Sequence, residues 1–379
     1  MNYKFPPIEL LDDIKAQGIF DDQEYVDSLK EKLIATLDSY KIEGKLMSVE
    51  ITPFSAVFEV MPAYGVSVKV FKNHRAEFEL RLGNPVEILE NEKGKNSVCI
   101  AVKSIKRPII GFRTLLETPE YLKMTSPLTV VIGYDILGGP LYYNIEAAPH
   151  MLIAGTTGSG KSVFLDNIIL SLLYKASPND VRIIMVDPKI VDMNYYKDIP
   201  HLLGPVINDM NKAYDMLLWL EDEMSRRYEV FSKFGVRDIN GYNQKNPNNK
   251  LPKIIFIIDE YMELMLEAPK EMELIINRLS SMARAVGIHL IITTQRPSSD
   301  VITNSIKANF PCRASLTVVD WRESRLILDR TGAQRLLGNG DMMFSTSGDG
   351  EPIHIQAAMV TDREIKRVVK YVVDNNQLE

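Results

Sequence analysis

The chain has 379 residues, more than one compact hydrophobic core usually spans, so two domains are expected. Hydrophobic residues make up 45% and charged residues 25%, which is typical of a globular protein and not of a disordered or fibrous one. The formal net charge of -6 argues against a protein that coats nucleic acid through its overall charge, so any site for a polyanion must be local.

The cysteines and the apolar segments bear on location. Only Cys99 and Cys312 occur, and neither lies near a histidine cluster, so neither a disulfide framework nor a zinc module is expected. Residues 1–11 lack the basic start and apolar stretch of a signal peptide, and the longest apolar runs are too short to cross a bilayer. The sequence therefore predicts a cytoplasmic protein that reaches a membrane only through a partner or a missing segment.

The first elements indicate a small α+β domain over residues 1–125. From Asp21 to Tyr40, apolar side chains recur at three- and four-residue spacing, which predicts an amphipathic helix. Three further segments alternate apolar and polar residues with a period of two, which predicts half-buried strands separated by turns. These segments are 56–60, 66–70 and 78–82.

From about Ser126 the pattern changes to short apolar runs that alternate with helical segments, typical of buried parallel strands in an α/β fold. The apolar runs are 151–154, 181–186, 254–258 and 289–293, and the helical segments include 213–231 and 272–285. Residues 126–379 are therefore expected to form a doubly wound α/β domain. Its ligand site belongs at the carboxyl ends of the strands.

The clearest motif follows the first of these apolar runs. Residues 155–162 read Gly-Thr-Thr-Gly-Ser-Gly-Lys-Ser, the spacing of a phosphate-binding loop between a strand and a helix. Backbone N–H groups of such a loop approach phosphate oxygens, Lys161 would neutralise the β and γ phosphates, and the Ser162 hydroxyl would bind Mg²⁺. A glycine-rich turn without a ligand is the alternative, which the Lys-Ser ending disfavours. The predicted nucleotide-binding residues are Gly155, Thr156, Thr157, Gly158, Ser159, Gly160, Lys161, Ser162 and Val163.

Two later strand ends carry polar residues that narrow the class of nucleotide-binding protein. The run 254–258 ends in Asp259 and Glu260; Asp259 would hold the Mg²⁺ shell and Glu260 would polarise the attacking water, unless the pair merely caps a helix. The next run ends in Thr294 and Gln295. Gln295 is the favoured γ-phosphate sensor because an amide can bridge a phosphate oxygen and a water molecule. The guanine-specifying N-K-x-D element is not found in the expected place, which favours ATP.

With these residues in view, the chain resembles the FtsK/SpoIIIE DNA translocases, whose motors have RecA-like folds. Residues 1–125 resemble the family's α domain more loosely. The resemblance implies a RecA-like P-loop NTPase motor domain at 126–379 and a smaller N-terminal α+β domain. The motifs that carry it include Val186-Asp-Pro-Lys189, Ile199-Pro-His-Leu-Leu203, Glu223-Met-Ser-Arg-Arg-Tyr228, Thr294-Gln-Arg-Pro-Ser298 and Leu337-Gly-Asn-Gly-Asp-Met342.

The resemblance also implies partners and further site residues. It implies an ATPase that moves double-stranded DNA in segregation or transfer and assembles with its own copies, as a hexameric ring with ATP between subunits. Arg284 matches the family's arginine that acts on a neighbour's nucleotide, and an arginine compensating a helix dipole is the alternative. Lys307 and Arg325 match DNA-contacting basic positions. Where the family commonly has lysine this chain has Trp321, so Arg322 beside it would take over the phosphate contact.

Alternatives to a DNA motor stay open. A secretion ATPase of the related type VII kind would bind a polypeptide, and similarity to the DNA translocases within 301–309 favours DNA over it. A third alternative is a scaffold protein that binds a nucleotide only for structural reasons. It is disfavoured because Asp259, Glu260 and Arg284 would then have no catalytic role. We expect neither a membrane-spanning region before Met1 nor a winged-helix domain after Glu379. We therefore expect an excised motor or a short relative that moves on duplex DNA without reading an orienting sequence.

Overall fold

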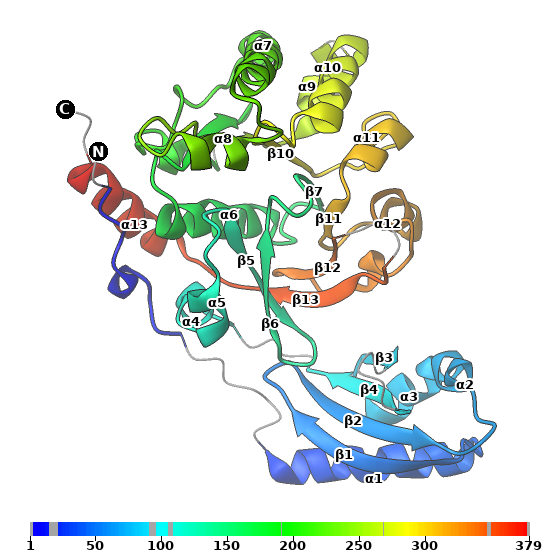
Figure 1. The fold of residues 1–379 in the computed structure, drawn as a ribbon. Coiled ribbons are helices and arrows are strands. Elements are labelled where there is room, and N and C mark those ends of the chain that lie inside the picture. Colours follow the sequence, from blue (N-terminus) through cyan, green and yellow to red (C-terminus); the bar gives the residue numbers. More distant parts are fainter. Residues whose placement is uncertain are drawn as a thin grey trace. The chain divides into compact units, whose positions relative to one another are not determined.

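The structure is a computed structural model that describes residues 3–14, 22–90, 96–104, 109–190, 192–267, 269–346 and 350–376. The chain folds into two compact units, each with its own β-sheet (Figure 1). The smaller unit comprises Ile14–Gly111 and Tyr134–Pro140, and the larger unit comprises Met1–Asp13, Phe112–Gly133 and Leu141–Glu379. The domain division expected at residue 125 stays a prediction.

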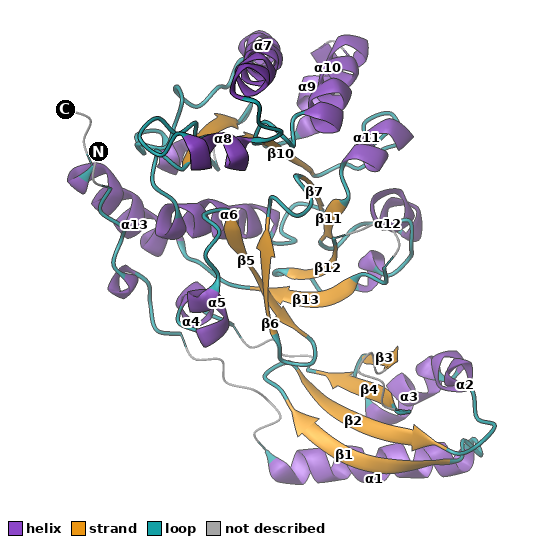
Figure 2. Ribbon diagram, in the orientation of Figure 1, coloured by secondary structure: helices purple, strands orange, loops and turns teal. Residues whose placement is uncertain are grey.

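The smaller unit packs helices on an antiparallel sheet of strand order β1-β2-β4-β3 (Figure 2). Its expected first helix is present: the Asp22 carboxylate caps it by accepting the N–H groups of Glu24 and Tyr25, and Leu29 and Leu33 are fully buried in the core. The described elements are α1 (Gln23–Ser39), β1 (Gly44–Ile51), β2 (Ser55–Pro62), α2 (Val68–Asn73), α3 (Arg75–Leu82), β3 (Val86–Glu90) and β4 (Val98–Lys103).

Two of the three strands expected in this region are wrong. Segment 56–60 lies in β2 as predicted, but 66–70 and 78–82 fall wholly or mainly in helices α2 and α3. In α3, Phe78 and Leu82 are buried while Leu80 between them is 79% exposed, so burial follows a spacing of four residues. Five residues with apolar side chains at the first, third and fifth positions fit either period, because the first and fifth also share one face of a helix.

The larger unit is built on a nine-stranded sheet of order β6-β5-β13-β12-β11-β7-β10-β9-β8. Strands β11, β7, β10, β9 and β8 run parallel, as expected for the α/β core, whereas β12 runs antiparallel to both β11 and β13. The strands are β5 (Thr129–Asp135), β6 (Pro140–Asn144), β7 (His150–Ala154), β8 (Val181–Val186), β9 (Lys253–Ile258), β10 (Ile288–Thr294), β11 (Cys312–Ser315), β12 (Asp341–Ser345) and β13 (Ile353–Ala357).

The central strands of this sheet are buried on both faces. Even-numbered residues of β7, β9 and β10, such as Leu152, Phe256 and Leu290, pack with helices α7, α9 and α10, and the odd-numbered residues are buried too. This double burial explains their near-continuous apolar sequences. The helices are η1 (Ile8–Leu10), α4 (Phe112–Leu116), α5 (Pro119–Lys123), α6 (Lys161–Lys175), η3 (Asn194–Tyr196), α7 (Met210–Phe234), α8 (Ile239–Lys245), α9 (Tyr261–Glu267), α10 (Pro269–Met282), α11 (Asn304–Asn309), α12 (Trp321–Leu328), η4 (Ala333–Arg335) and α13 (Asp362–Asn375).

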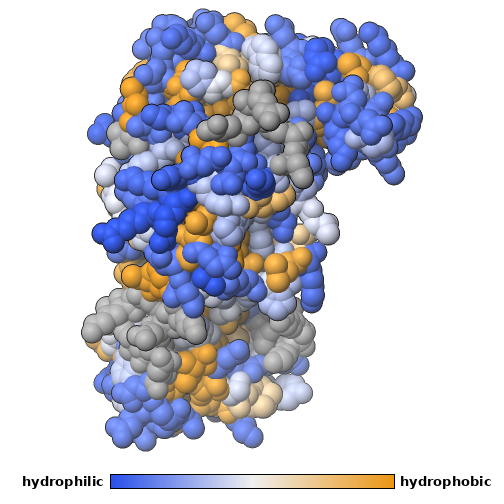
Figure 3. Space-filling model, turned by 90° about the vertical axis from the view of Figure 1, so that its left-hand side faces the viewer, coloured by the Kyte–Doolittle hydropathy of each residue, from blue (hydrophilic) through white to orange (hydrophobic). Residues whose placement is uncertain are grey.

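On the face seen in Figure 3, hydrophilic side chains predominate and apolar ones form scattered patches. Within the described ranges, no helix has both the length and the apolar character needed to cross a bilayer. The cytoplasmic location expected from the sequence stays a prediction.

Candidate nucleotide site

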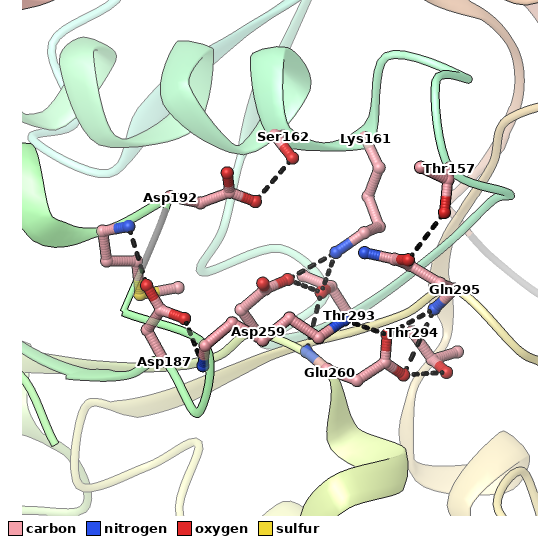
Figure 4. A network of polar contacts seen from close by, with 12 residues as sticks. Thr157, Lys161, Ser162, Asp187, Asp192, Asp259, Glu260, Thr293, Thr294 and Gln295 are labelled. Atoms are coloured by element: carbon pink, nitrogen blue, oxygen red, sulfur yellow. Dashed lines mark hydrogen bonds and ion pairs between the residues drawn. The ribbon is translucent and has the colours of Figure 1, made fainter. Parts of the chain in front are cut away.

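Four loops meet at one edge of the large sheet. Strands β7, β10, β9 and β8 are neighbours and run parallel, so the segments that follow them emerge side by side. These segments carry the phosphate-binding motif after β7, Thr294 and Gln295 at the end of β10, Asp259 and Glu260 after β9, and Asp187 after β8. Figure 4 shows Lys161 directed toward Asp259, and Thr157 toward Gln295, whereas Asp187 points into the turn that follows β8.

The phosphate-binding loop joins β7 to α6 as predicted. Gly158 and Gly160 have φ angles of 79° and 102°, in the left-handed region that favours glycine. A side chain at Gly160 would place its Cβ 2.5 Å from the backbone nitrogen of Gly340. The Gly340 N–H donates to the Ser159 carbonyl at 2.8 Å. The loop before β12 therefore packs against the phosphate-binding loop and is hydrogen-bonded to it. The Ser159 hydroxyl itself is buried with no hydrogen-bond partner among the described residues.

Lys161 and Asp259 form a buried ion pair. The Lys161 ammonium contacts the Asp259 carboxylate and donates to the Thr293 hydroxyl at 2.8 Å, and Thr293 in turn donates to Asp259 at 2.6 Å. The two charged residues are only 4% and 2% exposed. Burial raises the pKa of the Asp259 carboxyl, but the charge and hydrogen bonds of Lys161 and Thr293 outweigh it and hold that pKa below its usual range. Lys161, which is expected to bind the phosphates, is thus paired with the Asp259 carboxylate in this structure.

Glu260 is held in place by the end of the neighbouring strand. Its carboxylate accepts the Gln295 backbone N–H at 3.1 Å and the Thr294 hydroxyl at 2.9 Å. Its backbone has a φ of 58°, a strained value for a residue with a side chain, and such strain is concentrated at functional sites. The Lys189 ammonium lies 3.9 Å from the carboxylate. Gln295 also meets the phosphate-binding loop, because its side-chain oxygen accepts the Thr157 hydroxyl at 2.9 Å.

Ser162, the other predicted Mg²⁺ ligand, donates its hydroxyl to Asp192 at 2.7 Å (Figure 4). Among the described residues, no group of three or more acidic, histidine or cysteine side chains could hold a metal ion. Mg²⁺, however, commonly takes one or two carboxylates and completes its shell with water and substrate phosphates. One hydroxyl and one carboxylate, from Ser162 and Asp259, fit an ion that is bound together with a nucleotide.

Arg284 lies at the opposite edge of the sheet from these residues. It precedes β10, whereas Gln295 follows it, and β10 is 7 residues long. At ~3.3 Å per residue, the strand separates the two by roughly 20 Å. The Arg284 side chain is exposed and donates to the Ala147 carbonyl at 3.2 Å. The structure therefore does not bring Arg284 to the nucleotide site of its own chain.

The residues expected to contact DNA differ in exposure. The Lys307 side chain is only 14% exposed and forms an ion pair with Asp329. Arg322 and Arg325 are exposed on α12, and the Arg322 guanidinium lies 5.5 Å from the centre of the Trp321 ring. An open pocket of about 640 Å³ separates the start of α12 from the phosphate-binding loop and is lined by Thr156, Thr157, Gln295, Arg296, Val319 and Glu323, among others.

Two residues of this network, Thr293 and Asp192, are not predicted by the sequence patterns. Thr293, which bridges Lys161 and Asp259, was interpreted only as part of a buried strand, and nothing in its local sequence marks it. Asp192 stands three residues after the Asp-Pro-Lys motif, and neither its position nor its neighbours in sequence indicate a contact with Ser162. Both residues reach the site through contacts between segments that are distant in sequence, which a local pattern does not reveal.

The fold and the site together define the class of the protein, a P-loop ATPase. Solved structures of this class are similar in fold. The monomer form of the pCW3 conjugation coupling protein TcpA, with ATPγS, has a TM-score of 0.63 at 24% identity and covers 91% of this chain and 99% of that one. The cytoplasmic domain of the type VII secretion ATPase EccC of Thermomonospora curvata has a TM-score of 0.57 at 23% identity, over 65% of this chain and 31% of that one.

The chain belongs to the FtsK/SpoIIIE family. Residues 112–299 match the family model and residues 5–104 match that of the FtsK alpha domain. DNA translocase FtsK of Caldanaerobacter subterraneus subsp. tengcongensis is 42% identical over 374 residues, 98% of this chain and 53% of that protein. DNA translocase SpoIIIE of Bacillus subtilis is 39% identical over 388 residues, 100% of this chain and 49% of that protein. The chain thus spans about half the length of these relatives.

Proposed function

We propose that this chain is an ATP-driven motor that moves double-stranded DNA. The observation that carries the proposal is that similarity to proteins named DNA translocases extends over 98% of the chain at 42% identity, and so includes both units. The network at the sheet edge supplies the groups that hydrolysis requires. The structural similarity to a secretion ATPase is at 23% identity and supports only the fold.

In the proposed reaction, the backbone of residues 155–163 cradles the phosphates, and Lys161 leaves Asp259 to neutralise their charge. Bound Mg²⁺ would supply charge neutralisation at the transferred phosphoryl group, held by Ser162 and Asp259. Glu260 orients and polarises the attacking water. Gln295 senses the γ phosphate, a role supported by its contacts with Thr157 on one side and Glu260 on the other.

Arg284 is proposed to act on the nucleotide of a neighbouring copy. Its place at the far edge of the sheet supports this, because a guanidinium about 20 Å from its own site could reach a nucleotide only in another subunit. Such an arginine stabilises the charge that develops on the transferred phosphoryl group. The motor would then be a homo-oligomeric ring, in keeping with the hexamer that the family resemblance implies.

The DNA contacts are proposed to come from Lys307, Arg322 and Arg325, which would hold backbone phosphates without reading bases. Arg322 and Arg325 are exposed as the structure stands. Lys307 would first have to leave Asp329, so its contribution would depend on DNA displacing that ion pair. The net charge of -6 limits such contacts to a local surface.

The proposal is tested by the rate of ATP hydrolysis with and without long duplex DNA, with unfolded polypeptide as the competing substrate. The matched control is Glu260→Gln, which removes the negative charge while keeping a side chain of similar shape. We expect duplex DNA to stimulate the wild type and to leave the variant near background. Stimulation by polypeptide and none by DNA would instead support the secretion-ATPase alternative.

A further inference from the structure

The segment after β8 folds around one buried carboxylate. Asp187 is fully buried, and its two oxygens accept the backbone N–H groups of Lys189 and Ile190, both at 3.0 Å, and of Met193 at 3.1 Å. Ile190 has a φ of 55°, so the chain reverses sharply inside this turn. These hydrogen bonds hold the backbone of Lys189, Ile190 and Met193 close to the end of β8.

This turn brings Asp192 to the phosphate-binding loop. The Asp192 carboxylate accepts the hydroxyl of Ser162 at 2.7 Å, across 30 residues of sequence. Figure 4 shows Asp192 pointing at Ser162 from the side opposite to Lys161 and Asp259. The fixed turn thus delivers an acceptor to the one hydroxyl that the proposed function assigns to Mg²⁺.

The groups around Asp192 include a hydroxyl and an acidic side chain. Across the described ranges, no lysine or arginine forms an ion pair with Asp192. The acidic side chain of Asp166, one turn further along α6, lies close enough to interact electrostatically with it, and that carboxyl accepts the Tyr196 hydroxyl at 2.7 Å. Two neighbouring acidic side chains attract a cation that binds near them.

We infer that Asp192 is a positioning residue for the Mg²⁺ ligand Ser162. A serine hydroxyl has one hydrogen to donate and two lone pairs to offer. When the hydrogen is committed to Asp192, the lone pairs face away from that carboxylate and are available to a cation. The negative charge of Asp192 also favours a cation bound next to it. Partners of this kind, which orient a ligand, affect metal affinity by about 10- to 100-fold.

This inference rests on the proposed function, because it takes Ser162 to be the metal ligand. It concerns binding and can be tested without hydrolysis. The assay measures the affinity of the full chain for a fluorescent ADP analogue as MgCl₂ is varied, and again with excess EDTA. The variants are Asp192→Ala, Asp192→Asn and Ser162→Ala. The matched control is Asp198→Ala, an exposed aspartate in the same segment.

We expect Asp192→Ala to raise the MgCl₂ concentration for half-maximal binding by about 10-fold or more. Affinity in EDTA should not fall, and Asp198→Ala should behave as the wild type. Asp192→Asn keeps an oxygen that accepts the Ser162 hydroxyl but loses the charge, so it should give a smaller shift; it also serves if Asp192→Ala does not fold.

Three results separate the possible failures. If Asp192→Ala and Asp192→Asn both keep the wild-type Mg²⁺ dependence while Ser162→Ala loses it, Asp192 does not position the ligand. Equal losses of affinity with Mg²⁺ and with EDTA would mean that Asp192 only shapes the loop, which also overturns the inference. A wild-type chain whose nucleotide binding ignores Mg²⁺ would instead contradict the proposed function on which the inference rests.

Discussion

The buried pair of Lys161 and Asp259 gives the most quantitative prediction. The two residues are 4% and 2% exposed, so Lys161→Met leaves a carboxylate nearly out of contact with water. Breaking a buried ion pair on one side costs about 3–5 kcal/mol. Thr293 still donates to Asp259, and the carboxyl can take up a proton, so we expect the lower end, about 3 kcal/mol.

The magnitude can be checked by calorimetry and denaturant titration of the nucleotide-free protein. For a unit of this size, about 3 kcal/mol corresponds to a fall in the midpoint of thermal unfolding of roughly 6–12 °C. Asp259→Asn alone should also destabilise, because the buried ammonium then lacks its counter-charge. The double variant Lys161→Met/Asp259→Asn contains neither charge, so its loss should be smaller than the sum of the single losses by about 1–3 kcal/mol.

Additive losses, within about 0.5 kcal/mol, would refute this reasoning, because they would mean that the two charges do not depend on each other. The same lysine variant should lack ATP hydrolysis while keeping the circular dichroism of the folded chain. Hydrolysis retained in a folded variant would show that the lysine is not the group that neutralises the phosphates.

Three further predictions address the ring, the DNA contacts and the core. Mixing Arg284→Ala chains with Lys161→Ala chains should restore some hydrolysis if the arginine serves a neighbour, and no recovery despite demonstrated co-assembly would oppose that role. Changing Arg322 and Arg325 together to alanine should weaken duplex binding equally for all sequences and reduce the slope of log affinity against log salt by about 2. Burial lowers the pKa of His289 to about 4. Between about pH 6.5 and 4 its imidazole is therefore neutral in the folded chain and protonated in the unfolded chain. His289 alone should therefore lower the free energy of unfolding by up to ~1.4 kcal/mol per pH unit as the pH falls from about 6.5 toward 4, and a urea series should show less of the total loss in His289→Gln.

The larger unit could be predicted because its strands are buried on both faces. Every residue of β9 is buried, so its apolar run is unbroken and leaves no competing pattern. Its antiparallel extension, β12 and β13, was not predicted, because these five-residue strands carry no such run. In the smaller unit, alternation over five residues did not distinguish strand from helix, and tertiary packing decided in favour of α3.

The nucleotide site also contains residues that the sequence predicts and residues that it does not. Residues at strand ends could be predicted to converge, since parallel neighbouring strands end at one edge of the sheet. Asp192 reaches Ser162 only because a turn folds around Asp187, and no local pattern encodes that contact. Lys307 shows the reverse: its match to a basic position gave no sign that Asp329, 22 residues later in the sequence, pairs with it.

The most direct test of the account is displacement of a triplex-forming strand from duplex DNA. A motor that moves along the duplex strips the third strand ahead of it, whereas static binding does not. We expect the wild-type chain to release the strand with ATP and not with a non-hydrolysable analogue, and Glu260→Gln to release none while still binding duplex DNA. Hydrolysis by the wild type with no strand release, on DNA that it demonstrably binds, would contradict the claim that this chain is a DNA translocase.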